Sequence, residues 1–137
     1  MEEAITYYNE QDGLVLTVIE EHRNYDIIRW LIWMDQYRKV VLSYEELQTA
    51  LEKLQRGSLI ICDAHGPYCT FRGKMLLLGR DKVDTAEWIL RVQHRIQRCQ
   101  FRDMAPVRYS LPEAEYRARR REYDAWAESI KRKQGMP

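Results

Sequence analysis

The sequence predicts an α+β fold: a small antiparallel sheet of about five strands, one inserted helix, and two C-terminal helices packed on the sheet. Three observations support this prediction. Residues 14–42 are rich in β-branched and aromatic residues, which favour strands. Capping signals at Ser43 and Asp84 are followed by apolar residues at helical spacing. The C-terminal third combines many charged residues with the same helical periodicity.

The first three strands are expected before the first helix. Residues 14–21 alternate between two apolar faces, which predicts a strand. Residues 25–34 are rich in Ile, Trp and Tyr and are apolar on both faces, which favours a central strand. A buried helix stays open as an alternative there, because periodicity does not distinguish the two in a short apolar run. Residues 38–42 are expected to complete an antiparallel meander as the third strand.

A helix is predicted next. Ser43 is its expected N-cap, and Glu46 completes a capping box. Residues 58–63 and 75–79 are then predicted to be short strands. The segment between them, residues 64–73, contains two glycines and a proline and is expected to be a loop or a loose hairpin.

Two helices are predicted at the C-terminal end. Asp84 caps the first, which is expected to run to about Arg102. Ser110 and Glu113 form the capping box of the second, which is expected to run to about Lys133.

The charge distribution divides the chain. Residues 1–68 hold 6 Lys and Arg against 12 Asp and Glu, whereas residues 69–137 hold 16 against 9, so the net charge of +1 conceals a split. A chain of 137 residues with 45% hydrophobic content suits a single domain over 1–137, sheet-rich across 1–80 and helical across 84–133.

Four arginines recur at steps of 4, 3 and 4 in the basic half: Arg91, Arg95, Arg98 and Arg102. On one continuous helix this spacing places all four on a narrow face, where their charges repel one another. An acidic surface of a partner or of the same chain, a polyanion, or water and salt would offset that repulsion.

The last predicted helix carries a largely apolar, partly aromatic stripe: Tyr116, Tyr123, Ala127 and Ile130, with Trp126 at its edge. Two interpretations stay open. The stripe packs on the domain, or it is left for a partner or a second copy of the chain, because Tyr, Trp and Arg dominate interface hot spots.

No established catalytic motif is found: the sequence lacks phosphate-binding glycine loops, a nucleophile elbow and a His-Glu-x-x-His helix. Cys62, His65 and Cys69, with Cys99, offer metal ligands or a thiol nucleophile, but their spacing is not that of a standard zinc site. Buried structural cysteines are the favoured interpretation. Three cysteines, an odd number, indicate a reducing cytoplasmic compartment, and no apolar run is long enough to span a membrane.

These observations favour a non-catalytic, cytosolic protein-interaction module, such as an inhibitor, an immunity-type protein or a regulator, without metal or cofactor. The expected partner is a protein with an acidic surface. The alternative is nucleic-acid binding through the same basic face, and a homodimer through the C-terminal helix is a further option. The residues predicted to bind the partner are Arg91, Arg95, Arg98, Arg102, Tyr116, Arg120, Tyr123 and Trp126.

Overall fold

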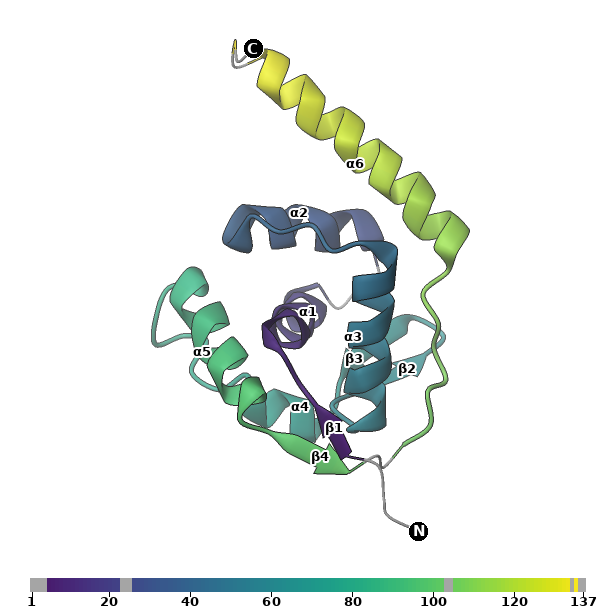
Figure 1. Ribbon diagram of the computed structural model, residues 1–137. Coiled ribbons are helices and arrows are strands. Elements are labelled where there is room, and N and C mark those ends of the chain that lie inside the picture. Colours follow the sequence, from purple (N-terminus) through teal and green to yellow (C-terminus); the bar gives the residue numbers. More distant parts are fainter. Residues whose placement is uncertain (1–4, 23–25, 103–104, 134, 136–137) are drawn as a thin grey trace.

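The computed structural model describes residues 5–22, 26–102, 105–133 and 135, and 62% of these residues lie in helices (Figure 1). The helices among the described residues are α1 (Glu10–Glu21), α2 (Ile27–Arg38), α3 (Tyr44–Arg56), α4 (Phe71–Leu76), α5 (Thr85–Gln97) and α6 (Glu113–Lys133). The strands there are β1 (Ile5–Tyr7), β2 (Ile60–Asp63), β3 (Gly66–Cys69) and β4 (Gln100–Arg102).

The predicted five-stranded sheet is wrong. The described strands form two separate antiparallel pairs, β1 with β4 and β2 with β3. The first pair joins the start of the domain to the end of α5, since Ile5 lies opposite Arg102. The second pair is a hairpin in which Asp63 lies opposite Gly66. The architecture is therefore mostly helical, and its short strands form one pair between distant segments and one local hairpin.

The segment predicted as the first strand, residues 14–21, belongs to helix α1. Asn9 and Asp12 form its capping box, and the residues from Asp12 to Ile19 are all buried. α1 lies in the middle of the molecule and contacts α2, α3, α5 and β3 (Figure 1). A helix enclosed on every side is apolar all round, so its sequence shows no polar face that would distinguish it from a buried strand.

The helix alternative for residues 25–34 is confirmed over the described part of that range, because Tyr25 lies outside it. Asp26 caps α2, whose buried residues Ile27, Trp30, Leu31 and Met34 follow helical spacing. The third predicted strand, residues 38–42, is wrong. α2 ends at Arg38, Lys39 adopts a left-handed conformation (φ 52°), and residues 40–43 lead to α3 without strand pairing.

Capping signals located two of the predicted helices. α3 begins after Ser43 with both bonds of the capping box to Glu46, and α5 begins after Asp84. The strand predicted at 58–63 is confirmed as β2, and the loose hairpin is completed by β3. Residues 75–79 do not form a strand, because they comprise the end of α4 and the turn that follows it.

Close contact between α1 and α5 builds one side of the core. A Cβ added at Gly13 of α1 would lie 2.8 Å from the Cα of Gln93 in α5, so only glycine allows these backbones to approach so closely. Trp88 of α5 is 1% exposed and donates its indole N–H to the carbonyl of Leu77 at 2.8 Å. α5 is thus held against both α1 and the turn after α4.

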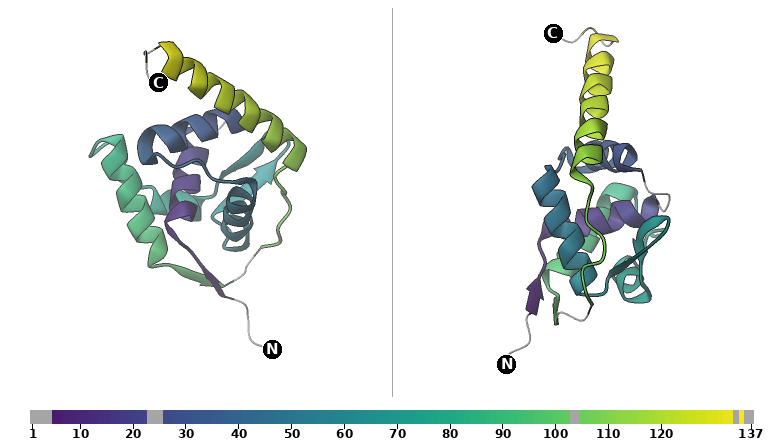
Figure 2. Two further views of the ribbon diagram at one scale, coloured as in Figure 1. Left: turned by 45° about the horizontal axis from the view of Figure 1, so that its top comes forward. Right: turned by 90° about the vertical axis from the view of Figure 1, so that its right-hand side faces the viewer.

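Two glutamines of α3 hold the extended segment that leads to α6. Gln55 is 3% exposed; its Oε1 accepts the backbone N–H groups of Arg108 (3.0 Å) and Tyr109 (2.9 Å), and its Nε2 donates to the Tyr109 carbonyl (2.9 Å). Gln48 accepts the N–H of Leu111 at 2.6 Å. α6 then packs its first half against α2 and extends beyond the rest of the molecule (Figure 2).

His22, at the end of α1, makes stability depend on pH. Its ring lies 4.8 Å from that of Trp33, and within the described chain its buried Nε2 has no hydrogen-bond partner. Burial lowers the pKa of His22 below its usual 6.5, Arg29 lowers it further, and Glu21 and Asp26 oppose the shift. Because the unfolded chain takes up the proton first, stability is expected to fall as pH decreases below about 6.5.

Urea unfolding of the wild type and a His22→Phe variant across this pH range checks the prediction. The variant keeps an aromatic ring beside Trp33 and is expected to show a shallower loss of stability below about pH 6.5. Identical pH dependence in the two proteins would contradict it.

Candidate protein-interaction surface

The four arginines predicted on one helix face do not share a helix. α5 ends at Gln97, Arg98 is its C-cap, and Arg102 lies on β4. The chain leaves the helix here because β4 pairs with β1 at the other end of the sequence. The predicted helix to about Arg102 is therefore too long, and the four arginines do not form one continuous row, because the chain changes direction after Arg98.

The arginines on α5 have different surroundings. Arg91 is half exposed and pairs with Glu87 at 3.2 Å, one turn earlier. Arg95 points to the turn after α4, where its Nη1 donates to the carbonyls of Leu76 (3.1 Å) and Leu78 (2.6 Å). Arg95 therefore fastens α4 to α5, whereas Arg91 and Arg98 face solvent.

Most of the aromatic stripe on α6 packs on the domain. Tyr116 and Tyr123 are 3% and 4% exposed; their hydroxyls donate to the Leu42 carbonyl and to the Asp35 carboxylate. Burial, together with the hydrogen bond to Asp35, raises the pKa of Tyr123 well above its usual value. These two side chains are thus part of the core, which is the first of the two interpretations left open by the sequence.

Two predicted partner-binding residues on α6 are closer to solvent. Arg120 is half-buried; it donates to the Tyr116 hydroxyl at 3.1 Å and lies 3.2 Å from Asp124. Trp126 is 45% exposed and lies beside Tyr123, with ring centroids 5.9 Å apart. On this helix, Trp126 is the large apolar side chain that a second copy of the chain could still reach.

Phe71, the most exposed large apolar side chain among the described residues, lies on α4, a helix that the sequence did not predict. Phe71, Met75 and Leu78 are 81%, 50% and 58% exposed, and we call them the α4 stripe. Their spacing of four and three residues puts them on one side of the short helix and its following turn. The helical spacing, together with the N-cap residue Thr70, is the signal that could have revealed them.

The opposite side of α4 is held firmly against the domain. Thr70 caps the helix by accepting the N–H of Gly73 at 3.1 Å. Gly73 packs so closely on the Leu59 carbonyl that a Cβ would lie 2.2 Å from its oxygen, and Leu77 is buried. The α4 stripe is therefore presented outward by a fixed element.

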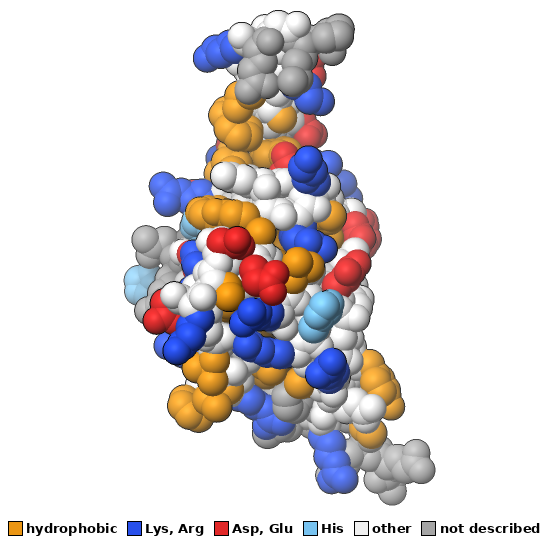
Figure 3. All heavy atoms as spheres, turned by 90° about the vertical axis from the view of Figure 1, so that its left-hand side faces the viewer, with side chains coloured by type: hydrophobic (Ala, Val, Ile, Leu, Met, Phe, Trp, Pro, Cys, Tyr) orange, Lys and Arg blue, Asp and Glu red, His pale blue; other side chains and the backbone are white. Residues whose placement is uncertain are grey.

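Basic residues outnumber acidic ones in the segment that contains the α4 stripe. Residues 70–102 hold 8 Lys and Arg against 3 Asp and Glu. Figure 3, which looks at the side carrying α5, shows Lys and Arg side chains spread around a few acidic ones, with hydrophobic side chains at its lower left. Exposed apolar side chains beside an excess of positive charge are complementary to an acidic, partly apolar surface.

The exposed face of α3 has the opposite charge. α2 and α3 are consecutive helices followed directly by a β-hairpin, an order that helix-turn-helix domains also use. In such domains the second helix reads DNA, but α3 carries Glu45, Glu46 and Glu52, and Gln48 and Gln55 hold the segment before α6. The three glutamates outnumber Lys53 and Arg56, the basic residues of this helix, so its net charge is unfavourable for binding phosphates.

The cysteine and histidine cluster does not form a metal site in the described structure, where no group of three or more His, Cys, Asp or Glu side chains is placed to hold an ion. Cys69 is buried beside the Leu16 carbonyl, at 3.8 Å. Burial, with the charge of Asp63, raises the pKa of Cys62 to about 11, which keeps its thiol protonated at neutral pH. Cys62 therefore lacks the thiolate character of a nucleophile.

Among the described residues, no helix is both long and apolar enough to cross a membrane. No protein-family model, curated protein or solved structure matches this chain.

Proposed function

We propose that this protein is a non-catalytic protein-interaction module, of the inhibitor or regulatory kind, that docks on an acidic surface of a partner protein through the α4 stripe and the arginines beside it. The observation that carries the proposal is the exposure of Phe71, Met75 and Leu78 on one side of a firmly held helix. The three free cysteines also fit the reducing, cytoplasmic compartment expected from the sequence.

Burial of the α4 stripe would supply the affinity. Covering a large apolar side chain is worth roughly 1.5–3 kcal/mol, and Phe71 has the most exposed area to cover. The fixed packing of Gly73 beneath the stripe limits the entropy lost on docking, because the helix is already ordered.

The arginines would select the partner. Arg91 and Arg98 are exposed and lie about one turn before and after Arg95, which donates to the carbonyls of Leu76 and Leu78, so we expect their side chains to lie beside the α4 turn. Positive charge at the rim of an interface raises the association rate with acidic partners and disfavours basic ones. The proposal therefore keeps Arg91 and Arg98 as partner-binding residues, as the sequence predicted. It assigns the apolar contact to the α4 stripe instead of to Tyr116 and Tyr123, which are buried.

A displayed library of short random peptides, selected on the full chain, tests the proposal. The selected peptides are expected to combine Asp or Glu with large apolar residues. Their affinity is expected to fall about tenfold or more on a Phe71→Ser variant, as for a hot-spot residue, and to weaken on an Arg91→Glu variant.

Matched controls lie on other faces. Tyr7 is 62% exposed on β1, and Arg29 is a 66% exposed side chain paired with Asp26 on α2. Tyr7→Ser and Arg29→Glu should leave peptide binding unchanged. Peptides that bind both Phe71→Ser and wild type equally would contradict the proposal.

The nucleic-acid alternative has a distinct outcome. Short DNA and RNA, single- and double-stranded, are titrated against the same variants at increasing salt. Binding that falls steeply with salt, disappears in Arg91→Glu and survives in Phe71→Ser would replace the proposal with nucleic-acid binding. Binding to anionic lipid vesicles that depends on Phe71, without any selected peptide, would overturn the proposal in favour of a membrane surface.

A further inference from the structure

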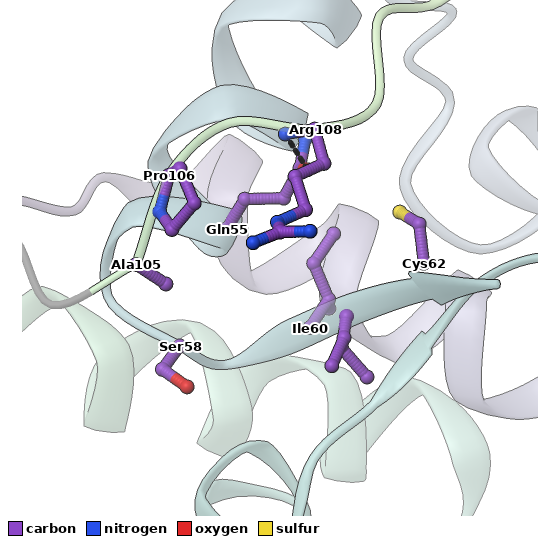
Figure 4. A pocket seen from close by; sticks show the side chains of 8 residues that line it. Gln55, Ser58, Ile60, Cys62, Ala105, Pro106 and Arg108 are labelled. Atoms are coloured by element: carbon purple, nitrogen blue, oxygen red, sulfur yellow. Dashed lines mark hydrogen bonds between the residues drawn. The ribbon is translucent and has the colours of Figure 1, made fainter.

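A cavity of about 320 Å³ lies between β2 and the extended segment 105–108. None of its lining residues belongs to the α4 stripe: they are Gln55, Ser58, Ile60, Ile61, Cys62, Ala105, Pro106 and Arg108. Figure 4 shows the side chains of Arg108 and Cys62 directed into the space between the two chain segments. Because the consecutive β2 residues Ile60, Ile61 and Cys62 line one side of the cavity, the cavity runs along this strand.

Among the described residues, β2 is paired along one edge, with β3, and its other edge is open. The register places Ile61 opposite Tyr68, and Thr70 donates its N–H to the Leu59 carbonyl at 3.0 Å. In an antiparallel pair, alternate residues direct both backbone groups to the partner strand. Leu59 and Ile61 therefore face β3, and the N–H and C=O groups of Ile60 and Cys62 face away from it.

These outward N–H and C=O groups border the cavity and form no hydrogen bond with other described residues. None of the hydrogen bonds between described residues involves the outward N–H or C=O of Ile60 or Cys62. Two such residues at alternate positions present the spacing of a strand edge, which is a template for pairing with an added strand.

The wall opposite β2 adds a charge. Arg108 is exposed, and the ion pairs within the described ranges do not include it. Its backbone N–H is held by Gln55 at 3.0 Å, so the base of this side chain is fixed above the cavity. Ile61, 48% exposed, supplies apolar surface on the same lining.

We propose that the open edge of β2 binds an extended segment of a partner protein as an added strand, with an acidic side chain of that segment paired to Arg108. Main-chain hydrogen bonds to Ile60 and Cys62 would give affinity, and Arg108 would select a carboxylate. This site is separate from the α4 stripe and does not depend on the function proposed for it.

A proline at position 62 removes one of the outward donors while sparing the hairpin. Because the N–H of Cys62 faces away from β3, its loss breaks no bond of the β2–β3 ladder, and proline is tolerated at such edge positions. The matched control is Cys62→Ser, which keeps the N–H and changes only the thiol. Thermal unfolding confirms that both variants fold.

Peptides from a displayed random library, selected on the full wild-type chain, are tested on these variants. Peptides that use this edge are expected to contain Asp or Glu, to bind Cys62→Pro about tenfold more weakly or worse, and to bind Cys62→Ser as they bind wild type. Arg108→Glu should weaken them as well. Amide hydrogen exchange at Ile60 and Cys62 is expected to be fast in the free chain and slower in the complex.

Three results would overturn the inference: protection of both amides already in the free chain, selected peptides that all bind Cys62→Pro as tightly as Cys62→Ser, or peptides whose binding leaves exchange at Ile60 and Cys62 unchanged. Peptides that respond to Phe71→Ser but not to Cys62→Pro would support the α4 stripe while rejecting the β2 edge. The two proposals therefore fail separately.

Discussion

Replacing Gly73 with alanine is expected to lower the free energy of unfolding by about 3 kcal/mol or more. The new Cβ would lie 2.2 Å from the carbonyl oxygen of Leu59, a backbone atom. Leu59 cannot move aside easily, because it is fully buried, its N–H donates to the Leu54 carbonyl, and its own carbonyl accepts from Thr70. The strain would separate α4 from the start of β2.

Urea unfolding of the purified variant measures this loss. Lys74→Ala is the control, since Lys74 is the next residue of α4 and its side chain is exposed; its effect should be within about 0.5 kcal/mol. A Gly73→Ala protein as stable as wild type would mean that α4 does not pack on Leu59 as described.

Replacing Gln55 with alanine is expected to cost about 2–3 kcal/mol and to release α6. The buried Gln55 side chain accepts the backbone N–H of Arg108 and that of Tyr109, and it donates to the carbonyl of Tyr109. Alanine leaves those backbone groups without their partners next to an apolar core, and each orphaned group costs about 1–3 kcal/mol unless water reaches it.

Hydrogen exchange and limited proteolysis of the segment 105–112 check the second half of the prediction. Faster exchange and new cleavage there are expected in Gln55→Ala. Gln48→Ala is the graded control, because among the described residues Gln48 makes a single hydrogen bond to this segment, from the N–H of Leu111; its effect on stability and proteolysis should be smaller. Equal effects of the two variants would contradict the central role given to Gln55.

Local sequence signals predicted the helices that begin at a capping residue. The capping box of Ser43 and Glu46 and the N-cap Asp84 located α3 and α5, since a cap depends on residues within one turn of each other. The hairpin around Gly66 was also predictable, because a positive φ of 104° suits glycine at a tight turn.

The central helix α1 could not be predicted in this way. Its residues Leu14 to Ile19 are β-branched or aliphatic on every side, which suits a strand as well as a helix. The helix is selected by neighbours far along the chain: Gly13 admits α5 at close range, and Asp12, 1% exposed, forms a 2.6 Å ion pair with Lys53 of α3. The predicted meander was wrong for this reason.

The candidate surface was predicted only in part. The excess of basic residues in the second half was visible in the sequence, and Arg91 and Arg98 do face solvent. The aromatic stripe was less predictable, because burial of Tyr116 and Tyr123 depends on Leu42 and Asp35, which lie more than 70 residues away in the sequence. The α4 stripe was missed because residues 64–73, which include Phe71, were predicted to be a loop or loose hairpin, and residues 75–79 were predicted to be a strand.

By itself, the sequence determined the charge division, the capped helices α3 and α5, and the hairpin, since each depends on composition or on residues a few positions apart. Only the tertiary structure decided that residues 14–19 are helical, that the arginine row breaks after Arg98, and that Phe71 rather than Tyr123 is exposed. The physical reason is the same in each case. Burial and strand pairing are contacts between distant segments, and their free energies outweigh the local propensities on which a single sequence reports.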